Sequence, residues 1–427
     1  MGRLITFMSV LIVGALTLAI GLVSLAPRQH MESADLTIPS DFSLKVSGEK
    51  LPSELLTPSA YAAAKTVAEM SLSDRVRSLL IVSLAGTDSA SLSGFVSHVG
   101  AGGFILMGKN IPSTAQELAT ETAALRGNSA FPRFVAIDEE GGEVKRLPYD
   151  TFPGANTLRN EPPSATSSAF SSRAALLNSV GVNLNFGIVA DVSSDPKSFI
   201  YGRSFGSDGT AVAERVSAAV SAEKSGFVSS TLKHFPGHGS AAGDSHTSIP
   251  ASGLDRAQWV ASDALPFVAG IKAGAQAVMF GHLSFPAIYA TPSSLSRTWH
   301  NILRQDLNFH GLAVTDDMTM LQRSKVPELA DPTRNAIRAF SAGNDLLVYT
   351  WGDAPSSAGI DVDELVNGIV AAVHQGEIPE KQITESALRA LAVRRTFAPE
   401  SASDSKACSV ACVLAYSKLG LTRTPTY

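Results

Sequence analysis

The residues best suited to catalysis lie in one short stretch, Lys233–Gly239 (KHFPGHG), followed by Asp244-Ser245-His246. Asp244 stands two residues before His246, a spacing at which a carboxylate can orient an imidazole and stabilise its charged form. An imidazole that titrates near neutral pH can donate a proton and later take one back. The stretch therefore indicates a catalytic loop in which His246 is the acid/base and Asp244 assists it.

Two other interpretations of this stretch stay open. His234 and His238 are four residues apart, which is the spacing of paired metal ligands on a helix. Pro236 and Gly237 lie between them and disfavour a helix, so we predict no metal site. The other alternative is a structural loop in which the histidines are incidental.

A second pattern is the pair of neighbouring carboxylates Asp316 and Asp317, directly after an apolar run. A carboxylate at the end of a buried strand can attack the electrophilic carbon of a sugar, and we predict this nucleophilic role for Asp316. The alternatives are a pair of calcium or magnesium ligands, or a structural role in which one carboxylate caps the next helix. Asp317 suits the capping role.

Two weaker patterns suggest groups that hold a sugar. In Asp138–Gly142 (DEEGG), a carboxylate suited to accept two hydroxyls is followed by paired glycines, which permit a sharp backbone turn. In Gly202–Gly206 (GRSFG), Arg203 offers donors for a hydroxyl or a carbonyl oxygen. Neither pattern is specific by itself.

The elements that must position these residues are short apolar runs that alternate with longer helical stretches between residues 61 and 398. The eight runs are Leu79–Leu84, Gly103–Met107, Phe134–Ile137, Val182–Val189, Val228–Leu232, Ala277–Phe280, Leu312–Val314 and Asp345–Tyr349. Continuous apolar runs are typical of parallel strands that are buried on both faces. The pattern predicts an α/β fold, a TIM-like (β/α)8 barrel in a single domain.

The chemically interesting residues follow directly after the strand-like runs. Examples are Asp138, Asp191, Lys233, His282 and Asp316. Because the C-terminal ends of all strands in such a barrel share one face, we expect these side chains to meet at one rim.

Composition and charge exclude several classes of protein. The formal net charge is −5, which argues against a nucleic-acid partner because such proteins carry a basic face. The two cysteines, Cys408 and Cys412, are too few for a disulfide scaffold or a four-cysteine zinc site.

The N-terminal segment predicts contact with a membrane. Leu4–Ala26 is a stretch of 23 residues without charge, long enough to cross a bilayer. We expect residues 1–26 to be a transmembrane anchor, or a signal segment if they are cleaved, with the catalytic domain outside the cytoplasm. Residues 27–60 are predicted to form a linker, residues 61–398 the barrel, and residues 399–427 a C-terminal tail.

Taken together, these motifs resemble a known family. Lys233–Gly239 with Asp244-Ser245-His246 resembles the signature of family 3 glycoside hydrolases of the β-N-acetylglucosaminidase type, in its bacterial single-domain form. Further blocks similar to that family occur in the same order, at Asn185–Val192, Gly202–Gly206, Gly281–Ile288 and Thr315–Met318. The resemblance covers roughly residues 70 to 395 and implies a TIM-like barrel.

The resemblance also implies a role for each matching residue. Asp316 matches the family nucleophile, and His246 matches the acid/base that Asp244 assists. The residues that match the binding site for the terminal GlcNAc are Asp138, Arg203, Lys233 and His234. The implied activity is a retaining exo-β-N-acetylglucosaminidase, a β-N-acetylhexosaminidase that cleaves GlcNAc-β-1,4 linkages in peptidoglycan-derived fragments and needs no cofactor.

Several alternatives remain at this point. Glu143 stands where the family often has Arg, and Glu139 where Gln is common, so the preferred aglycone stays open. A neutral imidazole does not repel an incoming anion, so a phosphorylase that uses phosphate in place of water is an alternative. An inactive, anchored sugar-binding protein is another. A β-glucosidase of the same family is disfavoured, because those members usually take their acid/base Glu from a second domain.

Overall fold

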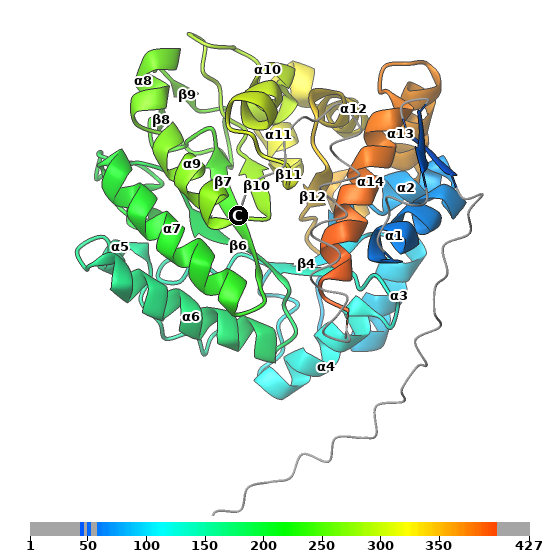
Figure 1. Ribbon diagram of the computed structural model, residues 1–427, viewed down its shortest axis with the longest axis horizontal. Coiled ribbons are helices and arrows are strands. Elements are labelled where there is room, and N and C mark those ends of the chain that lie inside the picture. The colour runs from blue at the N-terminus through cyan, green and yellow to red at the C-terminus, as the bar shows by residue number, and fades with distance from the viewer. Residues whose placement is uncertain (1–42, 47–48, 53–57, 399–427) are drawn as a thin grey trace, which may run out of the picture. The chain divides into compact units, whose positions relative to one another are not determined.

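Eight parallel strands close into a barrel in the computed structural model, which describes residues 43–46, 49–52 and 58–398 (Figure 1). The strands follow one another around the barrel in chain order, and the last strand pairs back onto the first. They are β3 (Leu80–Val82), β4 (Gly103–Leu106), β5 (Phe134–Ile137), β6 (Leu184–Val189), β7 (Ser229–Phe235), β10 (Ala277–Phe280), β11 (Leu312–Asp317) and β12 (Leu346–Tyr349). The predicted TIM-like barrel is confirmed.

Each of the eight apolar runs in the sequence contains the start of one barrel strand, and almost every strand residue is buried. Strands β7 and β11 extend beyond their runs, to Phe235 and Asp317. The pairing of β7 with β6 continues as far as Lys233, which lies opposite Val189. The sequence had placed Lys233 and Asp316 after the strand-like runs. In the structure both residues lie near the ends of the strands themselves.

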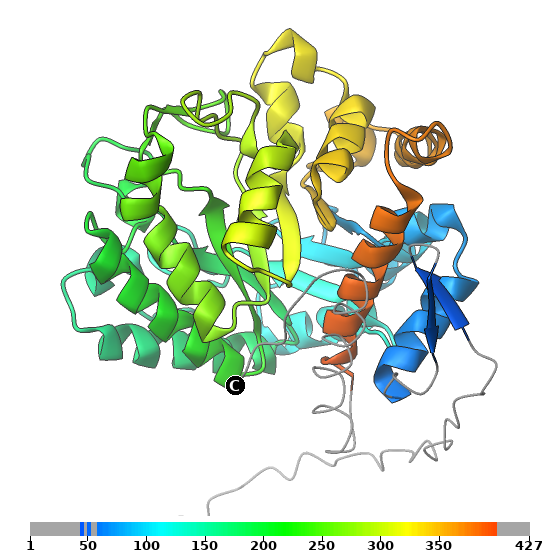
Figure 2. The same ribbon diagram turned by 45° about the horizontal axis from the view of Figure 1, so that its top comes forward.

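Helices surround the barrel (Figure 2), and residues just before several of them cap their first turns. Thr114 and Glu117 form a capping box at α4, and Asp208 accepts the Ala211 N–H at α7. The helices are α1 (Pro58–Glu69), α2 (Leu72–Arg77), α3 (Ser89–Val99), α4 (Ala115–Arg126), α5 (Ala155–Leu158), α6 (Pro163–Ser179), α7 (Gly209–Ser225), α8 (Arg256–Ala261), α9 (Ala264–Ala273), α10 (Arg297–Asn301), α11 (Thr319–Arg323), α12 (Pro332–Ala342), α13 (Val362–His374) and α14 (Glu380–Arg395).

Helix α14 covers the end of the barrel at which the strands begin. Asp345, fully buried just before β12, accepts hydrogen bonds from Ser386 at 2.7 Å and from Arg389 at 2.6 Å, both on α14. Arg394, near the end of the same helix, donates to the carbonyl oxygen of Phe131, close to the start of β5, at 2.6 Å. The opposite end of the barrel, where the strands finish, is left for the predicted site.

The predicted membrane segment lies outside the described residues, as does the predicted tail at residues 399–427. Among the residues that are described, no helix combines the length and apolar character needed to cross a bilayer. The predicted linker at residues 27–60 contains an antiparallel hairpin of β1 (Ser43–Val46) and β2 (Glu49–Pro52), together with the first residues of α1.

Candidate active site

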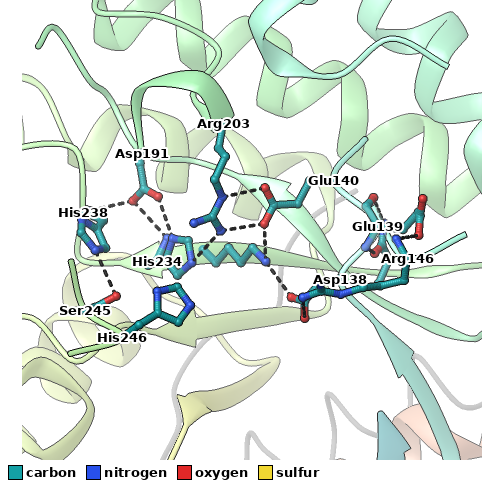
Figure 3. Close-up of polar contacts among 12 residues, drawn as sticks. Asp138, Glu139, Glu140, Arg146, Asp191, Arg203, His234, His238, Ser245 and His246 are labelled. Carbon is teal, nitrogen blue, oxygen red and sulfur yellow. Dashed lines mark hydrogen bonds and ion pairs between the residues drawn. The ribbon is translucent and has the colours of Figure 1, made fainter. Parts of the chain in front are cut away.

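The site begins with an ion pair between two strand ends. Asp138 directly follows β5, and its Oδ1 lies 2.8 Å from the Nζ of Lys233 on β7 (Figure 3). Burial raises the pKa of Asp138, but the charges of Lys233 and Arg146 outweigh that effect and lower it to about 2. Asp138 is therefore an ionised acceptor at neutral pH, which can accept hydrogen bonds from hydroxyl groups.

Glu140 links the two buried cations of the site. Its carboxylate accepts two hydrogen bonds from Arg203, from Nε at 2.9 Å and from Nη2 at 2.7 Å, and Oε1 is also 2.7 Å from the Nζ of Lys233. Burial raises the pKa of Glu140, yet the charges of Arg203 and Lys233 hold it below its ordinary value. The bidentate geometry fixes the guanidinium plane before any ligand arrives.

Asp191 contacts several groups of the histidine-rich stretch. Its Oδ1 accepts the backbone N–H groups of His234 at 3.1 Å and His238 at 2.6 Å, and its Oδ2 is 2.7 Å from His234 Nδ1. His234 Nε2 lies 3.4 Å from Nη2 of Arg203. Because a carboxylate only accepts and a guanidinium only donates, a neutral His234 carries its hydrogen on Nδ1.

Asp316 lies at the end of β11, next to the same group of side chains. Burial raises the pKa of this carboxyl, but the neighbouring imidazoles of His234 and His282 and the backbone N–H of Asp317 lower it to below its ordinary value. That N–H donates to Asp316 Oδ1 at 2.8 Å. Asp316 is therefore held as a carboxylate, the form that can act as a nucleophile.

Asp317 has a structural role instead. Its carboxylate accepts the backbone N–H of Thr319, the first residue of α11, at 3.1 Å, and the backbone N–H of Thr350 at 3.0 Å. It also pairs with Arg323 at 2.9 Å. The N-cap position of α11 is Met318, so Asp317 is not the cap residue itself, although it accepts the first N–H of that helix. Its carboxylate is thus engaged in structural contacts, while the nucleophilic role of Asp316 stays a prediction.

The acid/base predicted from the sequence is carried on the loop between β7 and β9 (Ala251–Ser252). Asp244 Oδ1 is 2.7 Å from His246 Nδ1, and it also accepts the backbone N–H of His246 at 2.9 Å. Burial raises the pKa of Asp244, and these hydrogen bonds lower it by more. The His246 side chain is 53% exposed, so it is open to an incoming ligand.

Comparison with known proteins identifies the family to which this barrel belongs. Residues 71–393 match the model of the glycosyl hydrolase family 3 N-terminal domain. The chain belongs to glycoside hydrolase family 3. A family relative, the beta-hexosaminidase A of Pseudoalteromonas piscicida, is 30% identical over 339 residues, which are 73% of this chain and 56% of that protein. The chain therefore spans little more than half the length of this relative.

Another relative covers more of its own length. The beta-hexosaminidase of Xanthomonas euvesicatoria pv. vesicatoria (strain 85-10) is 34% identical over 57% of this chain and 75% of that protein. Among solved structures, a glycoside hydrolase family 3 beta-N-acetylglucosaminidase from Paenibacillus sp. str. FPU-7 superposes with a TM-score of 0.70 at 28% identity. That match covers 78% of this chain and 64% of the solved one.

The family 3 barrel brings the predicted sugar-binding residues into one network. Its members are Asp138, Arg203, Lys233 and His234, joined by the contacts given above. Asp316 adjoins this network, whereas Asp244 and His246 form a separate pair on the loop. The sequence argument assigned no role to Glu140 and had named Asp191 only as a polar strand end. The sequence signal for Glu140 was the motif Asp138–Gly142, and the signal for Asp191 was its position two residues after the end of β6.

The two departures from the family pattern differ in their consequences. Glu139 turns inward and accepts the backbone N–H groups of Arg146 at 2.8 Å and Leu147 at 3.0 Å. Burial raises the pKa of Glu139 to about 8, so it adds no charge to the rim at neutral pH. Glu143 is exposed and packs against Gly202, because a Cβ added at Gly202 would lie 2.1 Å from Glu143 Oε1. Of these two residues, Glu143 is therefore the one that places an exposed acidic side chain at the rim of the site.

Among the residues that the structure describes, no three His, Cys, Asp or Glu side chains are arranged to hold a metal ion. His234 Nδ1 contacts Asp191, and His238 Nε2 lies 3.1 Å from the hydroxyl of Ser245. The histidines of this loop are thus engaged with protein partners.

Proposed function

We propose that the protein is a retaining exo-β-N-acetylglucosaminidase, a β-N-acetylhexosaminidase that hydrolyses terminal GlcNAc-β-1,4 linkages. The observation that carries this proposal is the place of Asp316, a partly buried carboxylate at the end of β11 whose pKa burial raises but the neighbouring His234, His282 and Lys233 lower by more. The β-hexosaminidase activity named for two relatives supports the choice of sugar.

In this proposal the terminal GlcNAc binds to groups whose geometry is set in advance. Asp138 accepts hydroxyl hydrogens from the sugar, while Lys233 and Arg203 donate to its oxygens. Glu140 holds both cations in place through contacts of 2.7 to 2.9 Å. Because these groups are already ordered, little reorganisation accompanies the reaction.

The reaction proceeds by two displacements at the anomeric carbon. Asp316 attacks this carbon while protonated His246 gives its proton to the departing glycosidic oxygen, and an α-linked glycosyl ester forms. Neutral His246 then takes a proton from water, the water oxygen attacks the anomeric carbon, and the ester bond to Asp316 breaks. The sugar leaves in the β configuration, and Asp244 stabilises the imidazolium in both steps.

A covalent probe tests the role of Asp316. A 2-acetamido sugar with an activated fluoride leaving group and slow turnover is expected to label the wild-type protein, and mass spectrometry should place the label on Asp316. Asp316→Ala should show no label, while Asp353→Ala, which removes an exposed carboxylate, should label as the wild type does. Labelling of Asp316→Ala at another residue would contradict the proposal.

A phosphorylase is the second candidate, and the exposed His246–Asp244 pair favours it because a neutral imidazole, acting as the base, does not repel an incoming phosphate. Titration of phosphate into turnover of an aryl β-GlcNAc separates the two activities. A hydrolase releases free GlcNAc at a rate indifferent to phosphate. A phosphorylase releases GlcNAc-1-phosphate, and its rate rises with phosphate concentration.

We further propose that the natural substrates are peptidoglycan-derived fragments and that the Leu4–Ala26 segment brings the barrel to the outer side of the cell membrane. The family resemblance supports the first statement, and the uncharged 23-residue stretch supports the second. Comparing kcat/KM for GlcNAc-anhydroMurNAc and for chitobiose tests the substrate. Fractionation of cells, followed by N-terminal sequencing, tests the location.

A further inference from the structure

One aromatic side chain on the catalytic face is neither in the core nor in the proposed chemistry. Phe199 lies between β6 and α7, just before the short 3₁₀ helix Tyr201–Arg203 that carries the binding arginine. Its side chain is 36% exposed, one of four large hydrophobic residues that are exposed among those the structure describes. Exposing an aromatic ring to water is unfavourable, so its position beside a site calls for an explanation.

Phe199 contacts the acid/base loop through its ring. The ring centroids of Phe199 and His246 are 5.1 Å apart and their planes meet at 78°, an edge-to-face arrangement. The ring of His238, on the same loop, is 5.8 Å from Phe199. Such contacts between aromatic rings contribute a modest but directional stabilisation.

The same ring contacts the sugar-binding network. The guanidinium carbon of Arg203 lies 5.1 Å from the centroid of Phe199, within the range of a cation–π contact. Arg203 is itself fixed by the bidentate pairing with Glu140. Phe199 thus lies between a rigid part of the site and the loop that carries His246.

This contact matters because the other partner of His246 cannot locate it. Asp244 orients the imidazole, but it belongs to the same loop and moves with it. Among the polar and ring contacts of the described residues, Phe199 is the one that joins His246 to a different segment of the chain. The hydroxyl of Ser245 contacts His238 and anchors the loop, but Phe199 is the side chain that ties the imidazole itself to the segment that carries Arg203.

We propose that Phe199 is a positioning residue that holds the His246 imidazole at the reaction centre through its edge-to-face contact with that ring and its cation–π contact with Arg203. This inference rests on the proposed function, in which His246 protonates the leaving oxygen. A displaced imidazole protonates poorly, so loss of Phe199 should slow substrates in proportion to how much their leaving group needs a proton.

Leaving-group dependence tests this, with a poorly activated phenyl β-GlcNAc compared with an activated dinitrophenyl β-GlcNAc. For Phe199→Ala we expect kcat/KM to fall about 10- to 100-fold on the phenyl glycoside and less than about threefold on the dinitrophenyl glycoside. Phe199→Tyr should restore the wild-type ratio. Phe227→Ala, which removes an aromatic ring that is 81% exposed before the start of β7, should leave both rates unchanged.

The control His246→Ala separates failure of this inference from failure of the proposed function. If His246→Ala shows the leaving-group dependence and Phe199→Ala slows both substrates equally or neither, the positioning role is overturned while the acid/base assignment stands. If His246→Ala slows both substrates equally, both are overturned. Phe199→Leu serves in place of Phe199→Ala should the latter fail to fold, as judged by thermal unfolding.

Discussion

Replacing Glu140 by Gln removes one negative charge from between Arg203 and Lys233 while it keeps the shape of the side chain. Three charge-assisted hydrogen bonds meet at this carboxylate, at 2.7, 2.9 and 2.7 Å. Each such bond contributes about 1.5–3 kcal/mol. The amide of Gln also turns an N–H₂ group toward cations that have only donors, so at least one of the three bonds is lost and replaced by a repulsive contact.

The magnitude follows from burial. Glu140, Arg203 and Lys233 are 4%, 9% and 2% exposed, so water cannot replace the lost partner. Breaking a buried ion pair by changing one partner costs about 3–5 kcal/mol. We therefore predict that Glu140→Gln lowers the free energy of unfolding by about 3 kcal/mol and, because Arg203 leaves its fixed position, lowers kcat/KM about 10²-fold.

Denaturant unfolding and initial rates on an aryl β-GlcNAc measure the two effects. Glu214→Gln is the matched control, because that carboxylate is exposed on α7 and has no ion-pair partner among the described residues. It should change each quantity little. If Glu140→Gln keeps the wild-type denaturation midpoint and a kcat/KM within about threefold of wild type, the idea that Glu140 organises the site is refuted.

Three further predictions follow from buried groups near the site and in the barrel wall. Burial raises the pKa of Glu121 to about 7 from an ordinary 4.5, and neither of its carboxylate oxygens has a hydrogen-bond partner. Because Glu121 has a higher pKa in the folded state than in the unfolded state, the wild-type protein loses stability as pH rises from about 4.5 to about 7. The stability gained by Glu121→Gln should therefore grow by about 3 kcal/mol between about pH 4 and pH 8 in denaturant titrations. Gly141→Ala and Gly142→Ala share the strain of a left-handed φ, at +78° and +68°, but only the first puts a Cβ 2.1 Å from Nη2 of Arg173, since the nearest neighbour of the second is at 3.4 Å. Both should lower the melting temperature, Gly141→Ala by clearly more. Asp191→Asn presents an N–H₂ group to Nδ1 of His234, which itself donates to Asp191 in the wild type. We expect kcat/KM to fall about 10²-fold while the circular dichroism spectrum stays that of the folded protein.

The barrel could be predicted because its signal is local. A run such as Phe134–Ile137 is apolar throughout, and this is the composition that a strand needs when both of its faces are buried. The ends of strands were less certain. Lys233 and Asp316 belong to strands by backbone pairing, which continues although the side chains have become polar. Hydrophobicity marks where a strand is buried, not where its hydrogen bonds stop.

The contacts of Glu140 could not be predicted, because three acids in a row give no indication of where each side chain points. In the structure Asp138 and Glu140 meet Lys233, while Glu139 turns inward to the backbone N–H of Arg146. The roles of the catalytic residues, by contrast, were suggested by residue type and family resemblance and stay predictions.

The pairing of β12 with β3 has a consequence for how the chain folds during synthesis. The first barrel strand finds β4 early, but its other edge stays unpaired until the last strand has been made. An unpaired edge is a template for association with other chains, so this edge is exposed for most of synthesis. Helix α14, which covers the end of the barrel, is made later still. A chain shortened before β12 would leave β3 and β11 with open edges, so we expect such a fragment to associate with other chains.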